Sequence, residues 1–214
     1  MPNWTNNNLI VAGEESLVQD FFKKHEHLNF NDIISRDEFV KEKKKDWDKL
    51  SDKEKTEQWR NDFVLYEFNN GGYQWNVTHW GTKWNILKDD GKGHNNGTHI
   101  KYMFNTAWAP PVPIIHKLIQ MYPKLNFDFN YSEPGMGFGG EIIAEQGEIL
   151  VDEQYNTIQY ECPECEYWGE ERDRGERNPE IRCEDCGHTF IYRSEIESES
   201  GSVNDTNVSK LNYG

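Results

Sequence analysis

Five stretches of the chain show the alternation of apolar and polar residues, or the short apolar runs, that predict β-strands. The clearest alternation extends from Lys124 to Glu133, where Leu, Phe, Phe and Tyr are separated by Asn, Asp and Asn. The other four predicted strands are residues 3–11, 99–107, 138–145 and 148–155. Gln146-Gly147 between the last two suits a tight hairpin turn. We also predict a short strand at residues 27–34.

Helical periodicity marks two further segments that face a core. Residues 15–26 place four apolar side chains on one stripe, and residues 111–122 show the same spacing before Pro123 ends that helix. Residues 36–62 differ, because their nine acidic and nine basic side chains cancel. Ser51-Asp-Lys-Glu54 has the form of a capping box. This charged segment therefore predicts two solvated helices with local ion pairs.

The repeated order of strand, helix and strand predicts an α+β fold, a ferredoxin-like βαββαβ sheet with both helices on one face. We expect this domain to cover residues 1–156, with a helical insertion at about residues 36–66. A small zinc-ribbon β-hairpin domain is expected at residues 157–193. Residues 194–214 are rich in Ser, Glu and Asn, which predicts a largely disordered acidic and polar tail.

All four cysteines lie in the predicted ribbon, as Cys162-Pro-Glu-Cys165 and Cys183-Glu-Asp-Cys186. Two Cys-x-x-Cys pairs separated by seventeen residues have the spacing of a zinc ribbon, in which four thiolates bind one Zn²⁺. Disulfides are the competing interpretation, but they are typical of secreted proteins, and we expect no signal peptide here. We therefore predict one structural zinc. A catalytic zinc would need an open coordination position, which four thiolates do not leave.

Apolar residues around the cysteines predict a miniature core for the ribbon, formed by Tyr160, Trp168, Ile181, Phe190 and Tyr192. Gly187 after the second pair suits a tight turn, whereas Glu166 stands at the equivalent position of the first pair. His188 is adjacent, but four thiolates complete the shell without it.

The net charge of −15 belongs to the second part of the chain. Residues 1–124 hold 17 acidic and 17 basic side chains, whereas residues 125–214 hold 21 acidic and 6 basic ones. Such a surface repels phosphates, so duplex nucleic acid is disfavoured and a basic protein partner is favoured. Acidity that serves solubility alone is the alternative. With no apolar run long enough to span a membrane, we expect a cytoplasmic protein without a membrane partner.

A second candidate site comprises tryptophans near Gly and Pro turns, together with one lysine and one glutamate. Its members are Trp75, Trp80, Lys83, Trp84, Trp108 and Glu133. Such a set can form an aromatic slot in which a base stacks and Lys83 meets a phosphate. Core packing is the competing interpretation, because large aromatic side chains mostly serve as core.

Four short motifs suggest a family. They are Met1-Pro2-Asn3-Trp4, Trp80-Gly-Thr-Lys-Trp84-Asn85, Thr106-Ala-Trp108-Ala-Pro-Pro111, and Tyr131-Ser-Glu-Pro-Gly135 followed by Phe138-Gly-Gly140. The chain resembles the YubB-like ferredoxin-like-domain proteins of phages, prophages and plasmids over about residues 1–145. The resemblance implies a ferredoxin-like fold and a mobile-element origin, but no activity. Relatives often have Cys where this chain has Thr5, so the resemblance supports no cysteine chemistry here.

No catalytic motif is present: there is no phosphate-binding loop, no Gly-x-Ser-x-Gly and no His-Glu-x-x-His. We therefore expect a non-enzymatic phage or mobile-element accessory protein that binds and modulates a host protein in the host cytoplasm. Host takeover or counter-defence would fit this role. The alternative is a module that binds or sequesters a nucleotide or single-stranded nucleic acid through its tryptophan-rich region.

Overall fold

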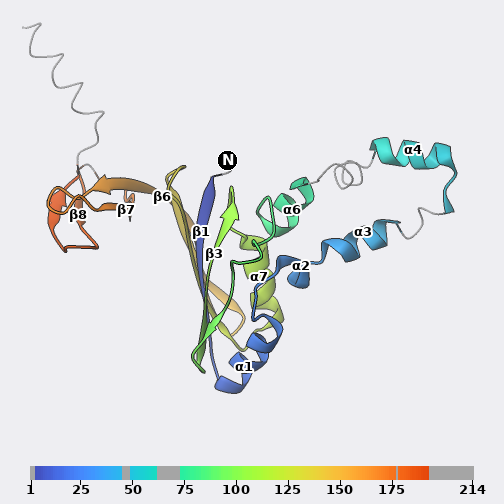
Figure 1. Cartoon of the computed structure of the whole chain (residues 1–214), viewed down its shortest axis with the longest axis horizontal. Coiled ribbons are helices and arrows are strands. Elements are labelled where there is room, and N and C mark those ends of the chain that lie inside the picture. Colours follow the sequence, from blue (N-terminus) through green and yellow to red (C-terminus); the bar gives the residue numbers. More distant parts are fainter. Residues whose placement is uncertain (1–2, 45–48, 62–72, 177, 193–214) are drawn as a thin grey trace, which may run out of the picture. The chain divides into compact units, whose positions relative to one another are not determined.

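The computed structural model describes residues 3–44, 49–61, 73–176 and 178–192 (Figure 1). The chain divides into two compact units, Met1–Tyr155 and Asn156–Gly214, and each is described by itself. Unit 1 contains the larger sheet and all the described helices. Unit 2 contains two short hairpins.

The sheet of unit 1 follows the predicted ferredoxin-like order. Its strands are β1 (Trp4–Ala12), β2 (His94–Asn95), β3 (His99–Ala107), β4 (Asn126–Glu133), β5 (Phe138–Glu145) and the first part of β6 (Glu148–Glu161). Helix α1 (Glu15–Lys24) follows β1, and α7 (Val112–Met121) follows β3. The strands β2-β3-β1-β4 lie antiparallel in that order, and β5 and β6 extend the sheet beyond β4. The chain order is therefore βαββαβ with two added strands.

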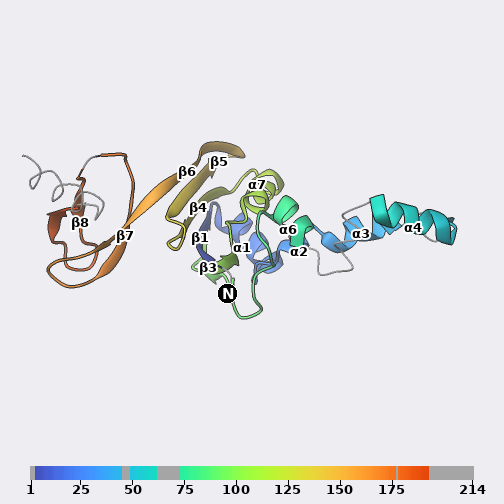
Figure 2. The same cartoon turned by 90° about the horizontal axis from the view of Figure 1, so that it is seen from above.

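Both core helices cover the same face of this sheet (Figures 1 and 2). Alternate strand residues, among them Leu9, Tyr102 and Phe129, are fully buried there. Phe21 of α1 lies in the middle of this core, with its ring centroid 4.8 Å from that of Tyr122. The period-two pattern of the strands and the helical stripe of α1 thus meet in one apolar layer.

Four described helices lie between α1 and β2. They are α2 (Phe30–Ile33), α3 (Arg36–Lys44), α4 (Asp52–Asn61) and α6 (Tyr73–Trp80). The capping box before α4 is confirmed, because the Ser51 N–H donates to Glu54 at 2.9 Å and the Glu54 N–H donates to the Ser51 hydroxyl at 3.4 Å. Residues 45–48 and 62–66 of the predicted insertion, and residues 193–214, lie outside the described residues.

The strand predicted at residues 27–34 is wrong. His27 forms only an isolated bridge with Lys92, and α2 occupies Phe30–Ile33. The side chain of Asn29 caps this helix by accepting the Asn31 N–H at 3.0 Å. The second strand is instead the two-residue β2 at His94–Asn95, where the sequence pattern predicts no strand. At residues 27–34, the helix cap of Asn29 outweighed the apolar pattern. At His94–Asn95, pairing with β3 produced a strand that has no pattern of its own.

Unit 2 is built from two antiparallel pairs. The end of β6 pairs with β7 (Trp168–Arg172), and β8 (Glu180–Arg182) pairs with β9 (Thr189–Ile191). Across both units, none of the helices among the described residues combines the length and hydropathy needed to cross a membrane.

Phe21→Ala is expected to lower the free energy of unfolding of unit 1 by about 3–5 kcal/mol, because it leaves a cavity among fully buried rings. Urea denaturation followed by tryptophan fluorescence measures this loss. Phe22→Ala is the matched control, since Phe22 only packs against the edge of the core and should cost less. Equal losses for the two variants would contradict the placement of Phe21 at the centre.

Candidate functional site

The two Cys-x-x-Cys turns of unit 2 have the same backbone geometry. The Cys162 N–H donates to the Tyr167 carbonyl at 2.8 Å, and the Cys183 N–H donates to the His188 carbonyl at 2.7 Å. In each turn, the residue after the second cysteine donates its N–H back to the carbonyl of the first, at 2.9 Å and 3.0 Å. These bonds hold both thiols of a pair on one side of the turn.

The returning N–H in each turn requires a left-handed backbone. Gly187 has φ +72° and Glu166 has φ +58°. Glycine adopts this region at no steric cost, whereas a residue with a Cβ is strained there by about 1–2 kcal/mol. The first turn therefore carries strain that the second avoids.

The four sulfur atoms fit a tetrahedral metal ion. The Cys162 and Cys186 sulfurs are 3.7 Å apart, as are those of Cys165 and Cys183, and all four lie within 4.8 Å of one another. A Zn–S bond of about 2.3 Å gives a tetrahedron with S···S edges of about 3.8 Å. The four cysteines can therefore bind a metal ion, with sulfur in all four positions.

The cysteine thiols of this cluster differ in pKa because they lie close together. Desolvation raises the pKa of the Cys183 thiol, but the N–H groups of Cys186 and Asp185 and the neighbouring thiols lower it to about 7. The Tyr167 N–H lowers the pKa of Cys165, but desolvation and three neighbouring thiols outweigh it and raise that pKa to about 12. The Cys183 thiolate therefore forms readily, whereas the Cys165 thiol needs a cation beside it to ionise. Metal binding must displace protons, so affinity falls as pH falls.

The apolar support of this centre is smaller than the sequence suggests. Tyr160 and Ile181 are buried, and Phe190 packs edge-on against Tyr160 at 5.7 Å. Trp168, which the sequence assigns to this miniature core, is 66% exposed. Gly169 allows the Tyr160 ring to approach the backbone, since a Cβ there would lie 2.4 Å from ring atoms. With so small a core, a metal ion bound by the four thiols would supply most of the folding free energy of unit 2.

A second cluster lies on the surface of unit 1 and is called here the aromatic–lysine surface. It consists of Trp4, Tyr73, Lys83, Trp84 and Trp108. The four aromatic side chains are each between 37% and 41% exposed. They come from the start of β1, the start of α6, the loop after α6 and the residue after β3. Segments far apart in the sequence thus meet at one place.

Lys83 lies among these rings. Its ammonium is 4.0 Å from the ring centroid of Trp108 and 4.9 Å from those of Trp84 and Tyr73. Each distance is within the range of a cation–π interaction. Within the described part of the chain, no carboxylate lies within ion-pair distance of Lys83. The cluster therefore presents a positive charge with an aromatic rim and no described counter-ion.

The backbone around Lys83 is fixed to the end of β3. The Lys83 N–H donates to the Ala107 carbonyl at 3.2 Å, and the Thr82 hydroxyl donates to the same carbonyl at 2.8 Å. The buried Asn76 amide donates to the Lys83 carbonyl at 2.8 Å. Gly81, two residues earlier, has φ +84° and packs against the start of α7, where a Cβ would lie 2.7 Å from Pro113. The lysine is therefore positioned by the scaffold.

Trp108 is strained. Its φ of +78° is rare for any residue with a Cβ and is an outlier for one of this size. The Trp108 N–H donates to the Asn3 carbonyl at 2.9 Å, which continues the pairing of β1 with β3 and holds this conformation. Strain of this kind costs about 1–3 kcal/mol and is concentrated at functional sites.

Polar side chains occupy this end of the buried sheet face. The Asn7 amide donates to the Phe104 carbonyl at 3.2 Å and to the Thr106 hydroxyl at 2.9 Å. The Asn7 amide oxygen and the Thr5 hydroxyl are buried without a hydrogen-bond partner among the described residues. Glu133 is 2% exposed and accepts the Met136 N–H. The apolar core thus ends in a polar layer at this end of the sheet.

The structure divides the second predicted site. Lys83, Trp84 and Trp108 come together on the surface. Trp75 and Trp80 are each 4% exposed and pack in the core, edge to face at 5.5 Å, so neither can stack on an external ligand there. Glu133 is buried in the polar layer.

Sequence reasoning missed Trp4 and Tyr73 as members of the surface. The pairing of Trp4 with Ala107 places Trp4 beside the loop that carries Trp84. The motif Met1-Pro2-Asn3-Trp4 was the available signal for Trp4. No sequence signal marked Tyr73.

Comparison with known families supports the fold. The chain contains a ferredoxin-like domain: residues 79–176 match the family model described as a ferredoxin-like domain in Api92-like protein. Among solved structures, the chain is similar to the crystal structure of a protein api92 from Yersinia pseudotuberculosis. That similarity has 9% identity, covers 73% of this chain and 99% of the other, and has a TM-score of 0.44. No curated protein matches the chain.

Removal of one thiol is expected to abolish stable metal binding. Native mass spectrometry of reduced protein should show one metal ion per chain at pH 7.5, and none in Cys165→Ser or Cys183→Ser. Retention should fall as pH falls below about 7, because protons then compete for the thiolates. The variant His188→Ser is the control and should keep the metal. Full metal content in either cysteine variant would contradict the four-sulfur site.

The two turns offer a matched pair of substitutions. Glu166→Gly should relieve the strained φ and tighten metal binding, whereas Gly187→Ala should introduce the same strain and weaken it. Each change is expected to be about 1 kcal/mol, or about fivefold in the dissociation constant. Competition with a chromogenic chelator measures both. A weaker site in Glu166→Gly would contradict the account of this turn.

Proposed function

We propose that this protein is a non-enzymatic binding protein that holds and modulates a host protein through the aromatic–lysine surface. The metal in unit 2 is zinc and has a structural role. The protein belongs to a phage or another mobile element, acts in the cytoplasm of the host, and serves host takeover or counter-defence. The origin rests on the four YubB-like motifs.

The observation that carries this proposal is Lys83 among three exposed rings. Binding hot spots are enriched in Trp and Tyr, and they are surrounded by contacts that exclude water. Here Trp84, Trp108 and Tyr73 supply the rim, and the ammonium at its centre would meet a carboxylate or a carbonyl of the partner. The scaffold fixes the backbone of Lys83 and Trp108 before binding, which lowers the entropic cost of association.

Zinc is the metal that the ligand set favours. Four thiolates in a tetrahedron are typical of structural zinc sites, whereas a catalytic zinc keeps one position open. The sulfur distances of 3.7 Å support such a closed shell. This closed shell is the reason for assigning the metal a structural role, and the lack of a catalytic motif in the sequence is the reason for a non-enzymatic class.

The charge of unit 2 favours a basic partner. Residues 156–192 hold ten acidic and four basic side chains, and the short strands leave most of them exposed. Long-range attraction would speed encounter with a basic surface and would repel duplex nucleic acid. Salt should therefore slow association more than it speeds dissociation.

A nucleotide or single-stranded nucleic acid is the second candidate for the aromatic–lysine surface. Exposed indole rings are sequence-tolerant stacking platforms for bases, and Lys83 has no described carboxylate to compete with a phosphate. This candidate predicts quenching of tryptophan fluorescence by a nucleotide or a short oligonucleotide. The protein-binding proposal predicts none at the same concentrations.

Trp108→Gly and Trp84→Ala should both abolish capture of the host partner. Trp108→Gly removes the ring while relieving the positive φ, so it should not destabilise the fold. Loss of one hot-spot ring is expected to cost at least about 2 kcal/mol, or about thirtyfold in affinity. Affinity capture from a host lysate, followed by binding measurements with the purified partner, tests this.

Trp168→Ala is the matched control, because Trp168 is an exposed tryptophan of unit 2 and should not affect capture. Capture that is indifferent to Trp84 and Trp108 would reject the aromatic–lysine surface as the binding site. Fluorescence quenching by an oligonucleotide that is lost in the same variants would favour the second candidate.

A further inference from the structure

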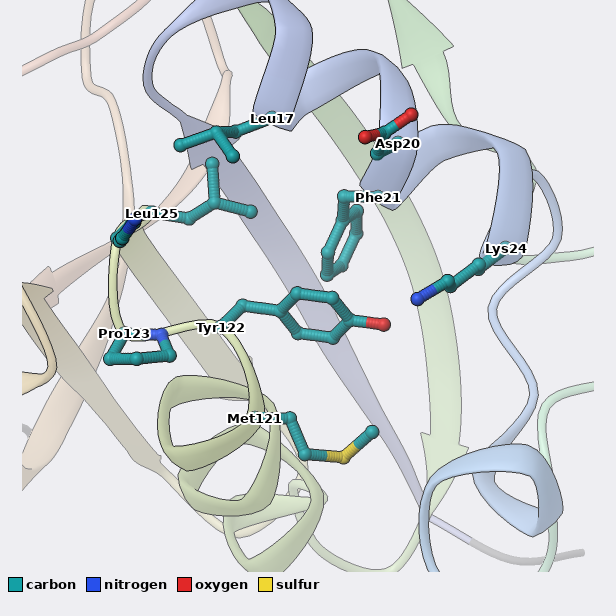
Figure 3. Close-up of a pocket in the computed structure, with 9 residues that line it drawn as sticks. Leu17, Asp20, Phe21, Lys24, Met121, Tyr122, Pro123 and Leu125 are labelled. Carbon is teal, nitrogen blue, oxygen red and sulfur yellow. The ribbon is translucent and has the colours of Figure 1, made fainter.

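A pocket of about 280 Å³ lies between α1 and the segment that ends α7, outside the sites described so far (Figure 3). Six apolar or aromatic side chains line it: Leu17, Phe21, Met121, Tyr122, Pro123 and Leu125. Its size is at the lower end of the range for small-molecule sites. The pocket therefore suits a short aliphatic or single-ring group rather than a lipid.

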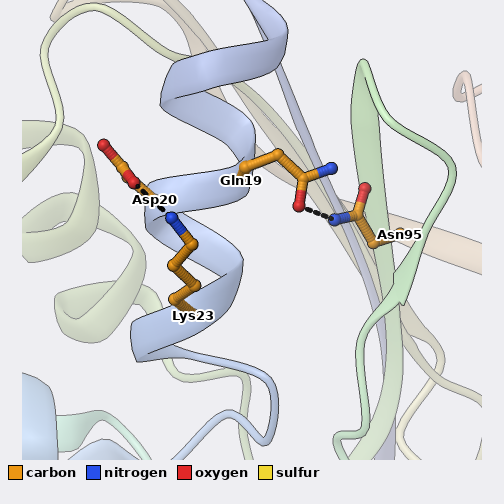
Figure 4. A network of polar contacts seen from close by, with 4 residues as sticks. All are labelled: Gln19, Asp20, Lys23 and Asn95. Atoms are coloured by element: carbon orange, nitrogen blue, oxygen red, sulfur yellow. Dashed lines mark hydrogen bonds and ion pairs between the residues drawn. The ribbon is translucent and has the colours of Figure 1, made fainter.

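The walls of this pocket are fixed before any ligand arrives. The Tyr122 hydroxyl is hydrogen-bonded to the Nε2 of buried His25 at 2.8 Å, and the Tyr122 ring packs edge-on against Phe21. Desolvation lowers the pKa of His25, so its ring is neutral beside this hydroxyl at pH 7. Gln19 of α1 accepts a hydrogen bond from Asn95 of β2 at 3.3 Å, which ties the helix to the sheet (Figure 4).

The rim of the pocket is positively charged, although the chain as a whole is acidic. Lys24 and Lys124 both line it, and the Lys24 side chain extends toward the Tyr122 ring, 5.8 Å from its centroid (Figure 3). Neither lysine lies within ion-pair distance of a carboxylate among the described residues. Asp20 is the one acid in the lining, and Lys23 pairs with it at 3.0 Å (Figure 4).

The end of α7 would by itself oppose an anion, because the carbonyls of a helix C-terminus carry partial negative charge. Two of these carbonyls are already used. Leu118 accepts the Tyr122 N–H at 2.9 Å, and Tyr122 accepts the Leu125 N–H at 3.0 Å. The macrodipole amounts to about half a charge, whereas Lys24 carries a full one. The net field at the rim therefore favours an anion.

We propose that this pocket binds a small amphiphilic carboxylate. The aliphatic or aromatic body lies among the apolar side chains, and the carboxylate meets Lys24 at the rim. The ligand is recognised by the combination of one apolar body and one negative end. This site is separate from the aromatic–lysine surface, so its occupancy does not depend on the proposed function.

The test is a titration of the full-length protein with octanoate and, in parallel, with 1-octanol, followed by NMR chemical shifts. Octanoate should shift resonances of Leu17, Phe21 and Leu125 and should bind at least about tenfold more tightly than the alcohol, which lacks the charge. Lys24→Gln should weaken octanoate about five- to tenfold and leave octanol unchanged, whereas Lys124→Gln, beside the other end of α1, should have a smaller effect.

Two further variants separate charge recognition from simple packing. Asp20→Asn should tighten octanoate binding, because it removes the only negative side chain of the lining. Lys117→Gln is the control, since Lys117 is an exposed lysine of α7 outside the pocket. Equal affinity for octanoate and octanol, no response to the Lys24 change, or no shifts at the lining residues would each overturn the proposal.

Discussion

The antiparallel register of β1 with β3 is the constraint on which the surface chemistry of unit 1 depends. Pairing of Trp4 with Ala107 places the first residue of one strand beside the last residue of the other. The Ala107 carbonyl accepts hydrogen bonds from Thr82 and Lys83. Trp108 is the first residue after the paired part of β3. A shift by one residue would turn Leu9 and Val11 out of the core. The buried face therefore fixes the register, and the register brings Trp4, Lys83 and Trp108 together.

Unit 2 depends on a different constraint, which is that its four cysteine sulfur atoms lie within 4.8 Å of one another. Its two turns repeat the same pair of backbone hydrogen bonds, and its apolar core is little more than Tyr160, Ile181 and the edge of Phe190. A core this small does not offset the conformational entropy of its strands. Unit 1 is stable through burial, whereas unit 2 would depend on a metal ion held by its four thiols, so the two should respond differently to chelators, acid and cavity-forming mutations.

Much of this organisation follows from the sequence, for identifiable reasons. Strands β3 and β4 show strict alternation because one face of each is buried. The candidate metal site is visible in the sequence because its cysteines come in two short Cys-x-x-Cys pairs. The strand β2 has two residues, too few for a pattern. Trp75 and Trp80 lie inside α6 and are buried, whereas Trp84 follows α6 and is exposed. The composition of this segment does not reveal where the helix ends. The positive φ of Trp108 arises from pairing between segments about a hundred residues apart, so no local signal predicts it.

The most direct test of the central claim is the NMR spectrum of the Lys83 side chain. If the register of β1 with β3 holds Lys83 over the rings of Trp108, Trp84 and Tyr73, the ring currents of these side chains shield its methylene protons. They should resonate well upfield of those of an exposed lysine such as Lys101, and Trp108→Gly should move them back toward ordinary values. Lys83 methylene resonances that match those of Lys101 in the unmodified protein would contradict the account.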